Sequence, residues 1–375
     1  MPAEIFGMIG NRLASEICTP RAPVFDHQFI RDAAQAHEQG GFDRILIGYY
    51  SNAPDGFLVG AYAAAHTERI GLLLAHRPGF VAPPVAARKL ATLDQLTEGR
   101  LALHVISGGS DADQRKDGDY LSHDERYART DEYLDILKRL WTADGPVDHR
   151  GDYYRFEGAT SEVRPAQKPR IPIFFGGSSD AAIEVGARHA DTYMLWGEPL
   201  ADTRDTIRRV RAAAARYGRT VRFSVSFRPI LGATEDEAWT RARIIHRSIV
   251  ASRPATPAAP QNVGSQRLLD AAARAAVHDR CLWTAIAEAT GARGNTTALV
   301  GTPETVADAL VDYYEAGVET FLIRGFDPLN NARQYGEQLV PLIRQKIAQV
   351  DRTRTSQRLA PVAQVAAPEP VGVAR

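Results

Sequence analysis

The 375-residue sequence has few cysteines, no excess of either charge and no long apolar run, and each absence excludes a class of protein. Two cysteines, Cys18 and Cys281, are too few for a disulfide framework, and no C-x-x-C metal or redox pair occurs. Basic and acidic residues number 45 each, so the charge gives no reason to expect binding to nucleic acid or to an anionic membrane. No apolar stretch approaches the roughly 20 residues of a membrane helix. Because a secretory signal is also missing, we expect a cytoplasmic protein.

Several catalytic motifs are absent as well. No G-x-G-x-x-G follows a strand, which argues against an open sheet that binds a dinucleotide. No cluster of histidine and acidic residues has metal-ligand spacing, so we expect no metal site and disfavour a metal hydrolase. The lack of G-x-S-x-G and S-x-x-K motifs disfavours covalent catalysis by serine.

Short apolar runs alternate along the chain with longer segments of helical period. Because each of eight predicted strands is followed by a helix, a closed (β/α)8 TIM barrel is favoured over an open doubly wound sheet. The predicted strands are 5–9, 44–47, 70–75, 101–106, 171–175, 192–196, 221–230 and 320–323. The predicted helices are 27–40, 57–66, 83–97, 124–142, 180–189, 202–217, 234–250, 303–316 and 331–349.

Two insertions interrupt the alternation. The first, at about 107–123, is polar, and the second, at about 252–298, begins rich in proline and alanine and continues through an alanine-rich segment that predicts a helix over 267–289. Long loops inside a compact domain are often lids or binding loops, and otherwise disordered. The composition predicts one domain over 1–350 and a disordered tail over 351–375.

The most informative segment is the strand, turn and helix start that includes Gly177, Ser178 and Ser179. The first turn of a helix has unpaired N–H groups and a partial positive charge, and glycine lets the backbone approach an anion. This turn therefore suits a phosphate, although an ordinary turn with a serine N-cap would look the same. A second segment places His123 and Tyr127 on one helix face, where both can reach a phosphate or ring edge, or where the tyrosine simply packs.

In a barrel the ligand site lies at the carboxyl ends of the strands, so the residues that follow each strand matter most. Aromatic and arginine side chains around a phosphate turn suit a planar phosphorylated cofactor and an anionic substrate. Trp196 either lines such a pocket or plugs the barrel top, and His104 is interpreted as a core residue. The arginines could each bind an anion or pair with an acid, but four near one mouth favour an anionic ligand: Arg77, Arg228, Arg293 and Arg324.

Taken together, these motifs resemble those of the luciferase-like flavin monooxygenases, and most closely the alkanesulfonate monooxygenases. Phe-Gly-Gly-Ser-Ser-Asp and Trp-Gly-Glu-Pro are both intact, and the matching segments run in family order from the first strand to about residue 348. The matching segments are Arg77-Pro78, Pro84–Arg100, Asp119–Tyr127, Phe175–Asp180, Leu195–Pro199, Asp236–Trp239 and Thr297–Gly301.

The resemblance implies a TIM barrel that binds reduced FMN supplied by a separate NAD(P)H-dependent flavin reductase. With O2 as co-substrate, such an enzyme splits the carbon–sulfur bond of a sulfonate into an aldehyde and sulfite. The resemblance also implies a dimer or tetramer, and a mobile second insertion with Arg293 closing over the substrate. By position, Gly177, Ser178, Ser179 and Tyr127 would hold the phosphate, His123 and Ser107 would lie near the ribityl chain or ring, and Arg77, Trp196, Arg228, Arg293 and Arg324 would line the substrate side.

This sequence departs from the alkanesulfonate enzymes on the substrate side only. Asn11 replaces a histidine, Ala53 a cysteine, Arg228 the histidine of an Arg-x-His, and Arg324 the serine of a Ser-Gly-Tyr. The new arginines could restore anion binding for a different sulfonate, such as a hydroxylated or sugar sulfonate. Equally, the substrate could be a heterocycle, sulfone or amine. The remaining hypotheses are an F420-dependent oxidoreductase and a flavin-binding protein without catalysis.

Overall fold

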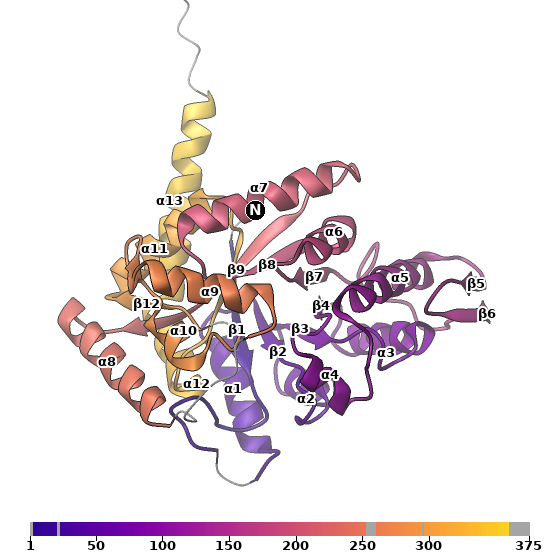
Figure 1. Ribbon diagram of the computed structural model, residues 1–375, viewed down its shortest axis with the longest axis horizontal. Coiled ribbons are helices and arrows are strands. Elements are labelled where there is room, and N and C mark those ends of the chain that lie inside the picture. Colours follow the sequence, from indigo (N-terminus) through magenta and orange to yellow (C-terminus); the bar gives the residue numbers. More distant parts are fainter. Residues whose placement is uncertain (1–2, 21–22, 253–259, 295, 360–375) are drawn as a thin grey trace, which may run out of the picture.

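Eight parallel strands form a closed barrel in the computed structural model, which describes residues 3–20, 23–252, 260–294 and 296–359 (Figure 1). Each strand pairs with the next in the order β1, β2, β3, β4, β7, β8, β9 and β13, and β13 returns to β1. The predicted TIM barrel is therefore confirmed. The barrel strands are β1 (Glu4–Ile9), β2 (Arg44–Ile47), β3 (Gly71–His76), β4 (Leu101–Val105), β7 (Ile173–Gly176), β8 (Thr192–Trp196), β9 (Arg222–Leu231) and β13 (Thr320–Ile323).

A ring of helices covers the outside of the barrel, and smaller elements decorate its ends. No helix in the described ranges has the length and apolar character needed to cross a membrane. The main helices are α1 (His27–Gln39), α2 (Gly56–Ala64), α3 (Pro83–Leu96), α5 (His123–Thr142), α6 (Asp180–His189), α7 (Leu200–Ala215), α8 (Glu235–Ala251), α11 (Pro303–Glu315), α12 (Pro328–Gln338) and α13 (Val340–Leu359). The smaller elements are α4 (Asp111–Lys116), α9 (Val263–Arg274), α10 (Ala285–Thr290), β5 (Val147–Arg150), β6 (Arg155–Ala159), β10 (Val277–His278), β11 (Leu282–Trp283) and β12 (Ala298–Gly301).

Most of the helices that follow the strands begin at short polar side chains. The hydroxyl of Ser122 accepts the N–H of Glu125 while the Glu125 carboxylate accepts the N–H of Ser122, which is a capping box at the start of α5. Asp26 and Thr302 cap α1 and α11 in the simpler way, by accepting one amide of the first turn. These caps fix the residue at which each of these helices begins, and so fix the length of the loop between the strand and the helix.

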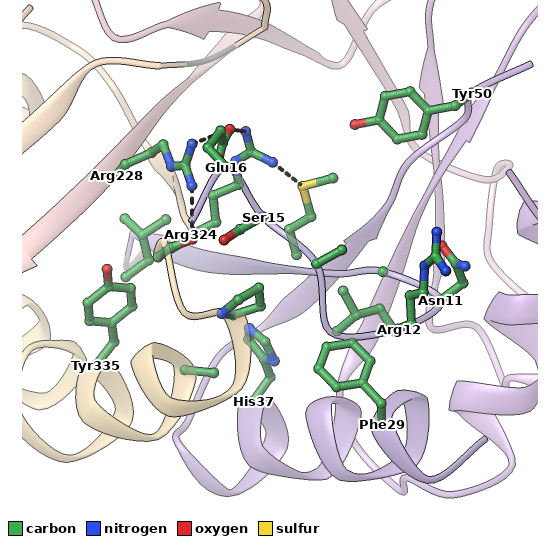
Figure 2. Close-up of a pocket in the computed structure, with 18 residues that line it drawn as sticks. Asn11, Arg12, Ser15, Glu16, Phe29, His37, Tyr50, Arg228, Arg324 and Tyr335 are labelled. Atoms are coloured by element: carbon green, nitrogen blue, oxygen red, sulfur yellow. Dashed lines mark hydrogen bonds and ion pairs between the residues drawn. The ribbon is translucent and has the colours of Figure 1, made fainter. Parts of the chain in front are cut away.

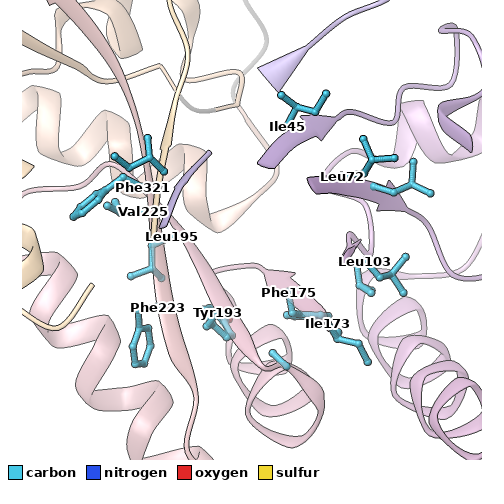
Figure 3. Packing of buried hydrophobic residues seen from close by; sticks show 14 of the residues in the cluster. Ile45, Leu72, Leu103, Ile173, Phe175, Tyr193, Leu195, Phe223, Val225 and Phe321 are labelled. Carbon is cyan, nitrogen blue, oxygen red and sulfur yellow. The ribbon is translucent and has the colours of Figure 1, made fainter. Parts of the chain in front are cut away.

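Apolar side chains pack on both faces of the barrel wall. Outward-facing residues such as Leu72, Phe175 and Val225 form the main core against the helices (Figure 3). The alternate residues of the same strands point inward, where Phe6 and Phe174 fill the barrel interior. The inner face therefore becomes open to ligand only above this apolar layer, at the carboxyl ends of the strands.

The second insertion folds differently from the prediction. Instead of one helix over 267–289, α9 ends at Arg274, a short hairpin β10–β11 follows, and α10 begins at Ala285. The hairpin turns at Asp279, which has a positive φ of 50°, and buried Leu282 and Trp283 pair with β12 beside β9. Burial of these two apolar side chains on the sheet outweighs the helix propensity of the alanines.

The C-terminal helix is also divided. The prediction of a single helix over 331–349 is wrong, because α12 ends at Gln338 and α13 starts at Val340. Pro341 explains the break, since proline lacks an N–H and its ring clashes with the carbonyl four residues earlier in a continuous helix. The second helix continues to Leu359, beyond the predicted start of the tail at 351, and the rest of the predicted tail lies outside the described residues.

His37 and His76 are buried beside the barrel wall, and His104 is partly buried on β4. Burial lowers the pKa of each imidazole to about 4, because a charged ring would lose its hydration. His37 donates through Nδ1 to the Ala33 carbonyl at 2.7 Å, and Nε2 of His76 lies 2.7 Å from the Tyr133 hydroxyl. All three are therefore neutral in the folded protein near neutral pH.

These histidines predict that the protein loses stability at pH values above those at which carboxylates usually titrate. A folded pKa below the unfolded value of about 6.5 means that only the unfolded chain takes up protons as the pH falls from 6.5 to 4. We expect the free energy of unfolding to drop by up to about 3 kcal/mol per histidine over this interval. Urea unfolding at about pH 7 and about pH 5 measures the drop. A constant stability between these values would contradict three neutral rings.

Candidate active site

The turn between β7 and α6 is held from both sides. Tyr193 donates its hydroxyl to the Gly177 carbonyl at 2.8 Å, and Ser179 caps α6 by accepting the Ala182 amide at 3.2 Å. A Cβ on Gly177 would lie 2.4 Å from the Ala182 side chain and 3.0 Å from the Tyr127 hydroxyl. Only glycine fits this position, and it brings the backbone against the tyrosine.

The start of α5 supplies the opposite wall of this turn. Tyr127 is buried, and burial raises the pKa of its phenol while a hydrogen bond with the Ser179 side chain acts in the other direction. The His123 ring lies tilted against it with ring centroids 4.8 Å apart, and its Nδ1 contacts the Asp124 carboxylate at 2.7 Å. The structure thus brings the predicted phosphate residues Gly177, Ser179 and Tyr127 together, with His123 at the exposed rim.

The end of β4 adds two polar groups beside this turn. Ser107 is buried, and its hydroxyl lies 3.0 Å from that of Thr130 on α5, so it is tied to the helix that carries Tyr127. His104 faces the barrel interior, with its Nε2 only 3.6 Å from where a Cβ on Gly176 would lie. Its buried Nδ1 has no hydrogen-bond partner among the described residues. The inward direction of His104 agrees with its alternation with Ala102 along β4, and its interpretation as a core residue stays a prediction.

Trp196 lies beneath the second insertion. A Cβ on Gly264, in the first turn of α9, would lie 3.0 Å from the Trp196 ring and 3.3 Å from the Ser178 hydroxyl. The adjacent Glu198 holds α9 through an ion pair with Arg267, whose Nε lies 2.7 Å from its Oε1. Sequence reasoning did not assign Glu198, whose role becomes visible only when α9 is placed. The start of α9 therefore covers both the Trp196 indole and the Ser178 hydroxyl.

The two insertions meet above the same strand ends. The amide of Asp111, in the first insertion, donates to the Gln261 side chain of the second at 3.2 Å. Arg77 anchors the first insertion, because its buried guanidinium pairs with Asp113 at 2.5 Å and Asp117 at 3.8 Å. It also lies over the Tyr49 ring, 4.7 Å from the centroid. Arg77 thus binds acids of its own chain.

A cavity of about 460 Å³ opens at the ends of β1, β9 and β13 (Figure 2). Apolar groups form much of its wall, and a cluster of charged groups forms one end. Its lining includes Met8, Asn11, Arg12, Ala14, Ser15, Glu16, Phe29, His37, Tyr50, Arg228, Arg324, Pro328, Ala332 and Tyr335. Concave sites with a mainly apolar wall and a few convergent polar groups are typical of small-molecule sites.

Arg228 lies at the charged end, where β9 leaves the barrel to pair with β12. It is 1% exposed, pairs with Glu16 at 2.6 Å, donates to the Gly325 carbonyl at 3.2 Å and covers the Phe326 ring at 3.6 Å. Burial is the largest influence on this guanidinium and lowers its pKa to about 10. Burial alone would raise the pKa of Glu16, but the charges of Arg228 and Arg324 and the hydrogen bond from Arg228 outweigh it and lower that pKa to about 2. Arg228 and Glu16 therefore form a charged ion pair at neutral pH.

Of the four arginines predicted to surround one mouth, two come together. The guanidinium of Arg324 contacts the Met8 sulfur at 3.6 Å and the Glu16 carboxylate at 3.8 Å, so Arg228 and Arg324 share one acid. Arg77 and Arg293 are not part of the cavity lining, and Arg293 is exposed between α10 and β12. Sequence reasoning missed Glu16, because a single acid in the irregular segment between β1 and α1 carries no distinctive signal.

Comparisons with known proteins agree with this architecture. Residues 5–320 match a family described as luciferase-like monooxygenase. Among solved structures, a riboflavin lyase with modified FMN and riboflavin superposes with a TM-score of 0.76 at 22% identity, covering 92% of each chain. EDTA monooxygenase from Chelativorans sp. BNC1 gives 0.75 at 19%, covering 92% of this chain and 94% of that one. The oxygenating constituent of 3,6-diketocamphane monooxygenase from Pseudomonas putida, in complex with FMN, gives 0.69 at 19%, covering 91% and 98%.

These structural neighbours share the fold, and the family match spans every barrel strand from β1 to the first residue of β13. The match also includes the glycine-serine turn, Tyr127 and Trp196, which the structure gathers at one end of the barrel. The chain therefore belongs to the luciferase-like monooxygenase family.

Proposed function

We propose that this protein is a monooxygenase that uses reduced FMN and O2 to cleave the carbon–sulfur bond of a small organosulfonate. A separate NAD(P)H-dependent flavin reductase would supply the reduced flavin. The observation that carries the proposal is the pairing, at one barrel end, of a glycine-serine phosphate turn with a cavity that contains two arginines. The family match supports the oxygenase chemistry, and the arginines support an anionic substrate.

The residues around Gly177 fit the phosphate of FMN. Ser178 and Ser179 offer hydroxyl donors. The first intrahelical bond of α6 runs from Ile183 to Ser179 and the Ser179 hydroxyl accepts the Ala182 amide, so the amides of Asp180 and Ala181 are left to an anion. The buried Tyr127 hydroxyl closes the other side of the turn. When bound, reduced FMN supplies two electrons to O2, so that one oxygen atom goes to the aldehyde and the other to water.

Other residues at this end of the barrel would position the flavin ring and the substrate and enclose them. The neutral His104 ring lies on the inner face between the phosphate turn and the barrel centre, where a flavin ring would extend. Trp196 and α9 cover the same end and exclude water. Arg324, 27% exposed in its side chain, lines the cavity and would contact the sulfonate, while Arg228 is paired with Glu16 in this structure.

A second candidate is oxygenation of a neutral substrate, such as a heterocycle or sulfone. The observation in its favour is the Glu16 carboxylate, which offsets one of the two guanidinium charges in a cavity whose wall is about half apolar. Both candidates use the same cofactor, so they differ only in what occupies the cavity.

Sulfite release decides between them. We expect the protein, given a flavin reductase, NADH, FMN and a panel of small sulfonates, to release sulfite and aldehyde in equal amounts from at least one member. A reaction without protein is the control, because free reduced flavin makes peroxide on its own. Absence of sulfite across the panel, with oxygenated product from a neutral heterocycle or sulfone, would establish the second candidate instead.

A further inference from the structure

The charged end of the cavity has the form of a filled anion site. We infer that the carboxylate of Glu16 occupies a binding site for a small tetrahedral oxyanion, formed by Arg228 and Arg324, and that a sulfonate or sulfate enters by displacing it. This inference deepens the proposed function, because it places the anionic group of the substrate, and it rests on that substrate being an anion.

Glu16 is more exposed than the Arg228 guanidinium with which it pairs. Arg228 is 1% exposed, whereas the Glu16 side chain is 28% exposed and lines the cavity together with it (Figure 2). The carboxylate therefore lies on the cavity side of the guanidinium. A ligand anion can pair with the guanidinium nitrogen that Glu16 now holds only by taking the place of that carboxylate.

The two arginines converge on one oxygen. Oε1 of Glu16 is 2.6 Å from Arg228 and 3.8 Å from Arg324, and these guanidiniums come from neighbouring strands, β9 and β13. Arginine presents planar N–H groups that match carboxylate, sulfonate and phosphate oxygens alike. Two such groups around one oxygen form the kind of clamp that binds an oxyanion.

Displacement needs little movement of the backbone. The turn that carries Glu16 is fastened by Ser15, whose hydroxyl donates to the Phe326 carbonyl at 2.5 Å and accepts the amides of Ile17 at 3.2 Å and Cys18 at 3.0 Å. With this anchor kept, rotation of the Glu16 side chain alone opens the clamp. Glu16 also keeps the buried Arg228 paired when no ligand is present, which avoids the cost of an uncompensated buried charge.

Sulfate binding to the flavin-free protein tests the inference. We expect Glu16→Gln to bind sodium sulfate and sodium methanesulfonate at least about tenfold more tightly than the unchanged protein by calorimetry, because the competing carboxylate is gone. Its Tm should fall in sodium chloride and recover in sodium sulfate of equal ionic strength. Glu337→Gln is the matched control, because it removes the same charge from an exposed position on α12 and should leave the sulfate affinity unchanged.

Equal sulfate affinities for Glu16→Gln and the unchanged protein would overturn the inference. If Glu16→Gln folds only in sulfate, that rescue supports it. If it folds in neither salt, Glu16→Asp is measured, since its shorter side chain holds the clamp less firmly and should bind sulfate more tightly. An affinity for Glu16→Asp no higher than that of the unchanged protein would also refute it. None of these readouts involves flavin or turnover, so a failure of sulfite release would leave them interpretable.

Discussion

Replacing Arg228 with methionine is expected to lower the free energy of unfolding by about 3–5 kcal/mol. The guanidinium is 1% exposed and is held by Glu16, the Gly325 carbonyl and the Phe326 ring, so its removal leaves an acid and a carbonyl without their donor. Urea unfolding at neutral pH gives the difference. The affinity for reduced FMN should stay the same, because the phosphate turn belongs to β7 and α6, and β8 separates β7 from the β9 strand that carries Arg228.

A double-mutant cycle separates the ion pair from simple loss of packing. Arg228→Met combined with Glu16→Gln should cost less than the sum of the single changes, because neither charge is then left alone. Arg208→Met is the comparison, since its pair with Asp205 is exposed and should contribute no more than about 1 kcal/mol. If Arg228→Met costs no more than Arg208→Met, then Arg228 does not hold the Glu16 segment in place.

Replacing both Ser178 and Ser179 with alanine is expected to weaken binding of reduced FMN by about 1–3 kcal/mol, or roughly 5- to 150-fold. The change removes two hydroxyl donors at the start of α6 and the cap that accepts the Ala182 amide. Calorimetric titration of the flavin-free protein with reduced FMN, under anaerobic conditions, measures the dissociation constant.

The cap itself needs a control, because losing it also destabilises the helix by about 1 kcal/mol. Thr302→Ala removes the equivalent cap of α11, where the hydroxyl accepts the Thr305 amide at 3.2 Å, and should leave flavin affinity unchanged. A double serine variant that binds reduced FMN like the unchanged protein would remove this turn from the phosphate site. A loss of affinity in Thr302→Ala would mean that helix stability, and not phosphate contact, is being measured.

Local patterns were enough to predict the barrel. Each strand is a short apolar run, most helices have a helical period and a side-chain cap, and both signals lie within a few residues of one another. Of the two exceptions, the division of the last helix has a local cause, Pro341, whereas the hairpin in the alanine-rich segment forms where Leu282 and Trp283 pair with β12. The second of these depends on burial against β12, which no single segment reveals.

What the sequence by itself determined is the eight-stranded barrel and the residues of the glycine-serine turn, because a strand, a glycine pair and a serine cap are contiguous. What only the tertiary structure decided is how the charges pair. Glu16 and Arg228 are 212 residues apart, and Arg77 and Asp113 are 36 apart, yet each pair forms one contact. Closing the barrel brings distant strand ends to one rim, where a buried arginine must find an acid, and which acid it finds depends on loop geometry in three dimensions.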